Sequence, residues 1–284
     1  METPAGFHLL PNLARIGFLL ASVWPAVAAD QSQWDGDEHA SVRLIAAAPR
    51  QSATDLSRAG VEIKLAPGWK TYWRYPGDSG VPPRFDFSGS DNVASVAVAW
   101  PAPHRFADGG GQSIGYKDGV IFPLQVKRRD AGKPATLRLK LDYAICEKLC
   151  VPAEATLALP LADPGTSQNS SLSAAEARVP RRLALGAGGE KLSIVSAQRI
   201  TNSGKPAVRV EIAGGTDADL FAEGPNAEWS LPLPAPLAPT GDGRQRFVFD
   251  LDGLPSGRDP NAPLDLKLTA VTASDAIETT VHLD

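Results

Sequence analysis

The stretch that decides the fold is TLRLKLDYAIC, residues 136–146, in which apolar and polar side chains alternate. A period of two is typical of a half-buried β-strand, because successive side chains of a strand point to opposite faces. Shorter alternating runs lie on both sides of it, at residues 42–44, 61–65, 208–212, 247–249, 264–268 and 277–283. Turn-forming clusters separate these runs, and a helical period is almost absent. Many short strands with frequent turns predict an all-β protein built from two β-sandwich domains.

The composition excludes several classes of function. The 284 residues carry a formal net charge of −4, so the chain lacks the basic excess expected of a nucleic-acid-binding protein. Its 26 glycines and 25 prolines are scattered without a repeat period, which indicates turn-rich globular sequence and not a collagen-like tract.

The first 29 residues have the pattern of a signal peptide. Arg15 precedes the apolar run 16–24, and the small residues Ala26 and Ala28 fit a signal-peptidase site. An uncleaved membrane anchor is the less favoured alternative, because the run is too short to span a bilayer and a proline interrupts it. We therefore expect an exported protein without its first 29 residues.

A polar segment before residue 172 is typical of a linker between domains. After it comes a predicted helix at residues 173–178, with Ser173 as its N-cap and Glu176 at capping-box spacing. The predicted organisation is a signal peptide at 1–29, a first domain at 30–164, a linker with a short helix at 165–188, and a second β-sandwich at 189–284.

The two cysteines of the chain, Cys146 and Cys150, lie at the end of the alternating stretch and are separated by three residues. An extended chain would hold their Cα atoms about 13 Å apart, roughly twice the span of a disulfide, so a bonded pair requires a turn. Closing so short a loop stabilises the fold by only ~2 kcal/mol, which favours a bond that opens and closes. Because Ile145 ends the inward-facing series, we expect Cys146 at the sheet edge or on the opposite face, close to solvent. An inert structural disulfide is the alternative, since such bridges are common in exported proteins.

Residues next to the cysteines influence the thiols in opposite directions. Lys148 favours the thiolate and Glu147 opposes it. Pro152 fixes the backbone after the turn and removes a ladder donor.

The aromatic segment at residues 68–77 offers a second set of candidates. Alternation places Trp69, Thr71, Trp73 and Tyr75 on one face and Lys70, Tyr72 and Arg74 on the other. We expect one face in the core and the other beside the cysteines. A stacking platform for sugars or for a partner protein is the alternative.

Three further motifs resemble functional sites, but the sequence around them does not support a catalytic, phosphate-binding or metal-binding role. Residues 77–80, GDSG, resemble the nucleophile segment of chymotrypsin-like proteases, but the histidine that precedes them in the exported chain, His39, is too close for that family's order of triad members. The glycine-rich residues 109–115 are expected to form a loop, because no helix follows to carry a phosphate site. The histidines are scattered, so no metal site is predicted, although a Cu(I) or Zn site with His104 beside the cysteines is an alternative.

Residues 143–152, YAICEKLCVP, resemble the cysteine segment of the N-terminal periplasmic domain of DsbD-type protein-disulfide reductases, and the spacing is nearer to the ScsB-like branch. Residues 65–74, 100–105 and 115–116 resemble the same branch in the same order. The likeness covers about residues 35–162. It implies an immunoglobulin-like fold, and ScsB-like proteins also carry a second β-domain.

The resemblance also implies a mechanism and partners. In this family a membrane-embedded partner reduces the domain, which then reduces oxidised periplasmic thiol proteins without a cofactor. Transferred to this sequence, Cys150 forms the mixed disulfide and Cys146 resolves it. No transmembrane conduit follows the second β-domain in this sequence, so we expect the donor to be a separate chain. The expected recipients are thioredoxin-like or disulfide-isomerase-like proteins.

In DsbD an aromatic cap loop shields the cysteines. The corresponding segment here, residues 107–114, is rich in glycine, so Tyr116 or Phe106 is the expected replacement. The residues predicted to flank Cys146 and Cys150 are Tyr143, Glu147, Lys148, Pro152, Tyr116, Trp73 and His104.

Together these observations predict a periplasmic thiol–disulfide oxidoreductase that acts as a component of protein-disulfide reduction. The alternative is a non-catalytic periplasmic binding or chaperone-like module with a structural disulfide.

Overall fold

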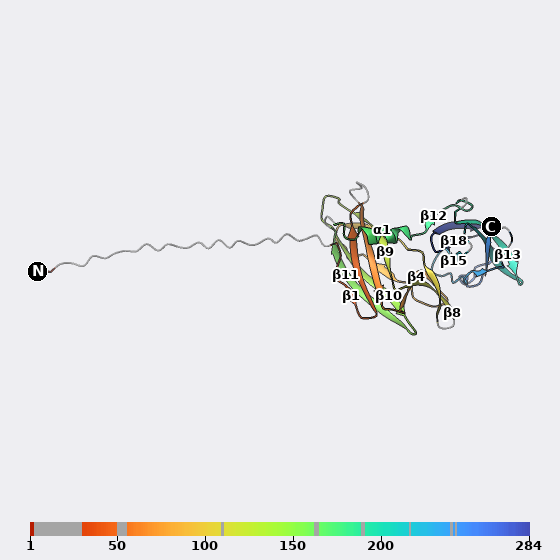
Figure 1. Cartoon of the computed structure of the whole chain (residues 1–284), viewed down its shortest axis with the longest axis horizontal. Helices are drawn as coiled ribbons and strands as arrows, with labels where there is room; N and C mark the ends of the chain where they lie inside the picture. Colours follow the sequence, from red (N-terminus) through yellow and green to blue (C-terminus); the bar gives the residue numbers. More distant parts are fainter. Residues whose placement is uncertain are drawn as a thin grey trace.

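The computed structural model describes residues 1–2, 30–49, 56–108, 111–161, 165–188, 191–215, 217–238, 241 and 243–284. Nearly all of the predicted signal peptide, residues 1–29, thus lies outside the described residues. In the part of the chain that is described, no helix is both long and apolar enough to cross a membrane. Figure 1 shows two bodies made almost entirely of strands.

The first body is a sandwich of two sheets. One, which we call the cysteine sheet, has the order β11 (Cys150–Pro160), β10 (Thr136–Cys146), β4 (Lys70–Gly77), β8 (Gly111–Lys117), β7 (His104–Asp108), with β5 (Arg84–Asp86) also paired to β10. The other, the facing sheet, has the order β1 (Asp35–Gly36), β2 (Ala40–Ala47), β3 (Leu56–Leu65), β9 (Gly119–Arg128), β6 (Val93–Val98).

The alternating stretch at residues 136–146 forms the whole of β10, as predicted. Its inward side chains are buried in the core of the first sandwich: Leu137, Leu139, Leu141, Tyr143 and Ile145. The facing sheet contributes the alternate apolar positions of β2 and β3, also as predicted. Burial of these two inner faces against each other is what holds the sheets together.

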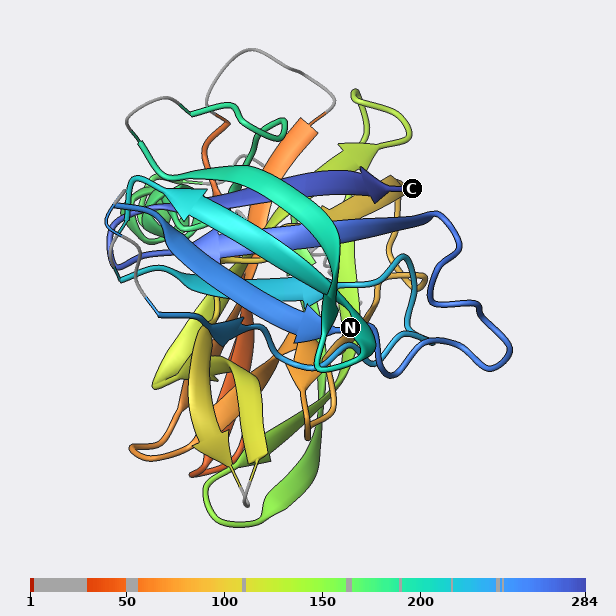
Figure 2. The same ribbon diagram turned by 90° about the vertical axis from the view of Figure 1, so that its right-hand side faces the viewer.

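The second body is another sandwich with a core cluster of its own. Its sheets have the orders β12 (Arg181–Arg182), β19 (Ala276–Leu283), β18 (Leu264–Val271), β15 (Asp219–Glu223) and β13 (Ser193–Asn202), β14 (Lys205–Ala213), β17 (Gln245–Asp250), β16 (Ala235–Pro236). The four alternating runs after residue 200 all lie in these strands, so the predicted all-β fold with two sandwiches is confirmed. Viewed from the side of the second sandwich, its strands run across those of the first (Figure 2).

The helix differs from its prediction. It is α1, Asn169–Ala177, which begins four residues earlier than expected and has no side-chain N-cap. Ser173 and Glu176 do not form a capping box, because both side chains bind Arg58 of β3, at 3.2 Å and 2.8 Å. The position of the helix is instead determined by Leu172, which is fully buried against the outer side of the facing sheet. Much of the segment predicted as a linker is therefore packed onto the first sandwich.

Candidate functional site

The two cysteines close the hairpin between β10 and β11. Cys146 is the last residue of β10 and Cys150 the first of β11, and they are register partners across a turn of residues 147–149. The predicted turn is thus confirmed. Directly opposed residues in an antiparallel pair have Cα atoms about 4.5–5.5 Å apart, which is within the range of a disulfide. Their Sγ atoms lie 2.7 Å apart, so a disulfide can form with little backbone movement.

The two thiols differ sharply in exposure. Cys150 is exposed, whereas Cys146 is only 1% exposed and is packed with Tyr72 and Ala144. Cys146 points away from the core that contains Ile145, as predicted. The prediction that Cys146 lies close to solvent was wrong, because its side chain is buried. The pair therefore has one sulfur that an external disulfide can reach and one that is held behind it.

Tyr72 of β4 links the exposed thiol to the buried part of the site. Its ring is fully buried, and its hydroxyl lies 2.9 Å from Cys150 Sγ, where either group can donate the hydrogen bond. Alternation in residues 68–77 placed Tyr72 on the face opposite Trp73, but Trp73 was the residue chosen as a site neighbour. That choice was wrong: Trp73 lies in the core of the first sandwich and contacts Phe221 of the second.

Residues 78–83, which we call the cover loop, lie against Tyr72. A Cβ atom added at Gly80, whose φ is +126°, would overlap the Tyr72 ring, so only glycine allows this approach. The loop is tied to β8 at Asp78, whose N–H donates to the Gln112 carbonyl and whose carboxylate accepts from the Gln112 N–H. The Ser113 hydroxyl also donates to the Ser79 carbonyl at 3.0 Å. The GDSG motif, to which no chemistry was assigned, therefore supplies part of this cover.

The segment expected to replace the aromatic cap loop has a different structure. Residues 107–108 and 111–114 belong to the strands β7 and β8, and residues 109–110 lie outside the described residues. Of the two expected shields, Phe106 lies on the cysteine side of the sheet and Tyr116 does not.

Phe106 lies between two ammonium groups. Lys70 Nζ lies 4.9 Å from the centroid of its ring and Lys117 Nζ lies 5.5 Å from it. Lys70 is also the register partner of Cys146 on the neighbouring strand. Neither lysine was selected for the site from the sequence.

Two predicted neighbours point into the core instead of toward the cysteines. Burial, followed by the charges of Asp37 and Asp35, raises the pKa of Tyr143 to about 12. Burial likewise raises the pKa of Tyr116, whose hydroxyl donates to the Pro101 carbonyl at 2.9 Å. Both phenols stay protonated at neutral pH and have structural roles.

The remaining predicted neighbours lie at different distances from the thiols. Glu147 and Lys148 are exposed in the hairpin turn, and Pro152 is exposed on β11 opposite Ala144. His104 lies on β7, three strands from β10 in the sheet order and therefore about 14 Å away.

His104 is thus not part of a cluster with the cysteines. Its Nε2 atom is 3.2 Å from the Arg178 guanidinium, and burial, Arg178 and Lys117 lower its pKa. Among the described residues, no three His, Cys, Asp or Glu side chains are grouped so that they could hold a metal ion.

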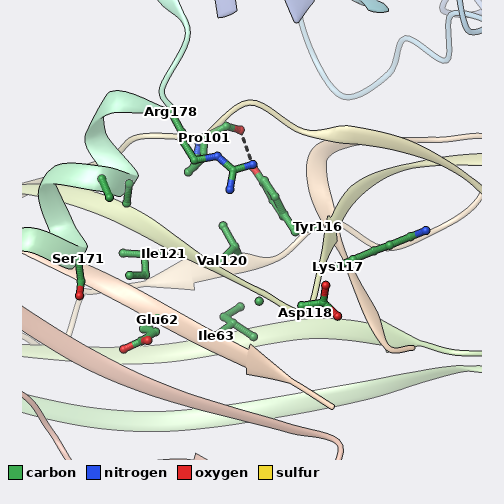
Figure 3. A pocket seen from close by; sticks show the side chains of 13 residues that line it. Glu62, Ile63, Pro101, Tyr116, Lys117, Asp118, Val120, Ile121, Ser171 and Arg178 are labelled. Atoms are coloured by element: carbon green, nitrogen blue, oxygen red, sulfur yellow. Dashed lines mark hydrogen bonds between the residues drawn. The ribbon is translucent and has the colours of Figure 1, made fainter. Parts of the chain in front are cut away.

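A pocket of about 470 Å³ lies between α1 and the first sandwich, away from the cysteines. Figure 3 shows side chains that line it, among them Ile63, Ile121, Lys117 and Arg178. Neither cysteine lines it, so we place the candidate site at the hairpin and not in this pocket.

A β-sandwich that presents one exposed and one buried thiol at the end of a hairpin has the features of a thiol–disulfide exchange domain. Residues 42–162 match the family described as "Thiol:disulfide interchange protein DsbD, N-terminal". This part of the chain is similar to the DsbD N-terminal domain family, which has an immunoglobulin-like fold and is involved in thiol–disulfide exchange. The resemblance read from the sequence is thereby confirmed.

The fold similarity extends over both sandwiches. The crystal structure of the N-terminal periplasmic domain of ScsB from Proteus mirabilis superposes with a TM-score of 0.70. The two sequences are 23% identical, and the match covers 89% of this chain and 98% of that one. A search among curated proteins gave no match.

Proposed function

We propose that this protein is a periplasmic thiol–disulfide exchange protein. It relays reducing equivalents from a membrane-embedded thiol donor in a separate chain to oxidised periplasmic thiol proteins. The observation that carries the proposal is the pairing of the exposed Cys150 with the buried Cys146, whose Sγ atoms are 2.7 Å apart. The periplasmic location is supported by the signal-peptide pattern of the first 29 residues and by the similar ScsB domain, which is periplasmic.

The proposed reaction has two steps. The Cys150 thiolate attacks one sulfur of a partner disulfide, so that a mixed disulfide forms and the partner's other sulfur leaves as a thiolate that takes up a proton. Cys146 then loses its proton and attacks Cys150 Sγ, which releases the partner's second thiol. The protein is left with a Cys146–Cys150 disulfide and the partner has gained two electrons and two protons. The donor's dithiol restores the reduced state by the reverse exchange.

The surroundings of the thiols support these roles. The exposed sulfur is the one that a macromolecular disulfide can approach in line, and the buried sulfur can be reached only by Cys150. Tyr72 can donate to a Cys150 thiolate, and a hydrogen bond to the charged form stabilises it.

Exposed apolar side chains beside Cys150 support a protein as the partner. Leu149 is 76% exposed and Val151 is 40% exposed, one on each side of Cys150 in the chain. Val81 of the cover loop, next to the glycine that contacts Tyr72, is 57% exposed. Large exposed apolar side chains grouped at one place indicate a protein-binding surface. A thioredoxin-like or disulfide-isomerase-like protein that presents its disulfide within an apolar rim would fit it.

The first test is the reduction potential of the Cys146–Cys150 couple in the exported chain, measured against defined thiol buffers. A potential between about −180 and −270 mV is expected for an exchange protein, whereas one below about −300 mV indicates a structural bond. The low value would overturn the proposal in favour of a binding module.

Single-cysteine variants test the assignment of roles. Cys150→Ser should abolish exchange, while Cys146→Ser should accumulate mixed disulfides that are visible on non-reducing gels. Wild-type behaviour of both variants would refute the mechanism.

A further inference from the structure

We infer that the second sandwich holds strand β4 in the position that places Tyr72 beside Cys150, and that Arg74 is the positioning residue through which it acts. This inference rests on the proposed function, because it assigns the second sandwich a part in the reactivity of Cys150. It assigns the second sandwich no catalytic group of its own.

Arg74 is the centre of the contact between the two sandwiches. Its guanidinium donates to both carboxylate oxygens of Glu223, at 2.8 and 2.7 Å, and to Glu278 at 2.6 Å. Glu223 and Glu278 belong to β15 and β19 and are 8% and 9% exposed. Burial opposes the charge of Arg74, but the two carboxylates raise its pKa above the usual value. If the Arg74 guanidinium moved away, the buried carboxylates of Glu223 and Glu278 would lose their counter-charge, which is energetically costly.

The residues on either side of Arg74 make the same connection. Trp73 packs against Phe221 of β15 with ring centroids 5.8 Å apart. The Tyr75 hydroxyl donates to the Leu231 carbonyl at 2.7 Å. Three consecutive residues of β4 are therefore attached to the second sandwich, and the residue just before them is Tyr72.

Strand β7 is attached in the same way. Arg105 donates to both carboxylate oxygens of Asp219, at 2.7 and 3.1 Å, and to the carbonyls of Leu220 and Pro234. The next residue is Phe106, whose ring lies between Lys70 and Lys117. Both strands are thus attached to the second sandwich, and on β4 the attached residues directly follow Tyr72.

Hydrogen-bond geometry makes the reactive sulfur sensitive to small movements of β4. The contact between Tyr72 and Cys150 is 2.9 Å, and hydrogen bonds weaken steeply with distance and misalignment. Pairing between β4 and β10 extends over Thr71 and Lys70 only, so the rest of β4 is not held by β10. On its other side, β4 pairs with β8 up to Tyr72 and then loses register until Gly77, so the contacts of Arg74 hold the segment that directly follows Tyr72.

The test compares Arg74→Gln with Arg58→Gln in the full exported chain. Arg58 is a matched control, because it also binds one carboxylate through two nitrogens and is similarly buried, with a side chain 14% exposed against 19% for Arg74. It connects β3 to α1, far from the cysteines. The readouts are the unfolding midpoint, the rate at which iodoacetamide alkylates Cys150, and the reduction potential.

We expect both variants to lower the unfolding midpoint, but only Arg74→Gln to slow alkylation of Cys150, by roughly tenfold, the effect of losing one hydrogen bond to an ionised group. The double variant Glu223→Ala/Glu278→Ala removes the acceptors of Arg74 and should change alkylation in the same direction, which provides a test should Arg74→Gln not fold. A wild-type alkylation rate and potential in folded Arg74→Gln, or in the double variant, would overturn the inference. Failure of the proposed function would instead be seen in the wild-type protein, as a reduction potential as low as that of a structural disulfide.

Discussion

The hydroxyl of Tyr72 is the one polar group that the structure places on Cys150 besides the other thiol, among the contacts of the described residues. It lies at the end of a ring that is fully buried, so its position is set by packing and not by solvent. A donor held in this way stabilises a thiolate without the entropic cost of ordering a mobile side chain.

Tyr72→Phe should therefore slow the attack of Cys150 on a protein disulfide by roughly tenfold while it changes the free energy of unfolding by no more than about 1.5 kcal/mol. Stopped-flow exchange with a disulfide-containing thioredoxin-like protein measures the first, and urea unfolding the second. Tyr143→Phe is the matched control, because Tyr143 lies on the opposite face of the same sheet. Equal rates for Tyr72→Phe and the wild type would remove the hydroxyl from the mechanism.

His104 makes the stability of the folded protein depend on pH. Its ordinary pKa of 6.5 is lowered in the folded protein by burial, Arg178 and Lys117, while Asp219 acts weakly in the other direction. The unfolded chain then binds the proton more tightly than the folded one, so stability falls as the pH drops through 6.5 toward the lower folded pKa.

His104→Gln should show a smaller loss of stability on acidification than the wild type. Urea midpoints at about pH 7.5 and about pH 5.5 measure it, since this interval spans the ordinary histidine pKa. His39→Gln is the control. His39 lies in the turn between β1 and β2 of the facing sheet, where its imidazole stacks on Trp69 and not on Arg178. A pH dependence that is unchanged in His104→Gln would contradict the assignment.

Which residues surround the thiols could be predicted only in part. The alternation of residues 136–145 places Tyr143 on the same side as Ile145, so the sequence already contained the argument against Tyr143 as a neighbour of the cysteines. The pairing of β4 with β10, which places Lys70 opposite Cys146, cannot be read from alternation because register between distant strands depends on tertiary packing. Tyr72 and Lys70 enter the site through such pairings.

At the scale of elements, the cover loop packs on the ring of Tyr72 and is tied to β8. Gly80 permits this, since its φ of +126° and its contact with the Tyr72 ring both exclude a side chain. The same element was seen in the sequence only as a protease-like motif. Its function in packing follows from the fold, because β4 turns back over its own outer face after Gly77.

Gly80→Ala should displace the cover loop and expose the buried thiol. We expect destabilisation of about 1–3 kcal/mol from backbone strain, and faster alkylation of Cys146 in the Cys150→Ser background. Mass spectrometry after timed treatment with iodoacetamide measures the exposure. Gly204→Ala is the control, because Gly204 has a φ of +82° but open space around its Cβ position. Equal alkylation of Cys146 in both glycine variants would show that the loop does not shield it.

The helix α1 illustrates how packing overrides a local signal. A capping box was read at Ser173 and Glu176, but Arg58 binds both side chains, and the helix starts earlier so that Leu172 can be buried. Capping contributes about 1 kcal/mol, whereas burying a leucine contributes about 2–3 kcal/mol, so the burial decides.

At the scale of the whole molecule, the two sandwiches share apolar surface. Phe221 of β15 belongs to the second sandwich in sequence but lies in the core cluster of the first, where it is fully buried against Trp73. Together with the ion pairs of Arg74 and Arg105, this contact should make the two sandwiches unfold as one unit.

Phe221→Ala should lower the free energy of unfolding by about 3–5 kcal/mol, because it removes a large buried ring and leaves a cavity at the contact. It should also separate the single calorimetric transition of the wild type into two, as each sandwich retains its own core cluster. Phe249→Ala is the matched control, since Phe249 is buried within the core of the second sandwich and away from the first. That variant should destabilise the second sandwich and, through the intact contact, keep one transition. Two transitions in the wild type, or one in Phe221→Ala, would show that the sandwiches unfold independently of this contact.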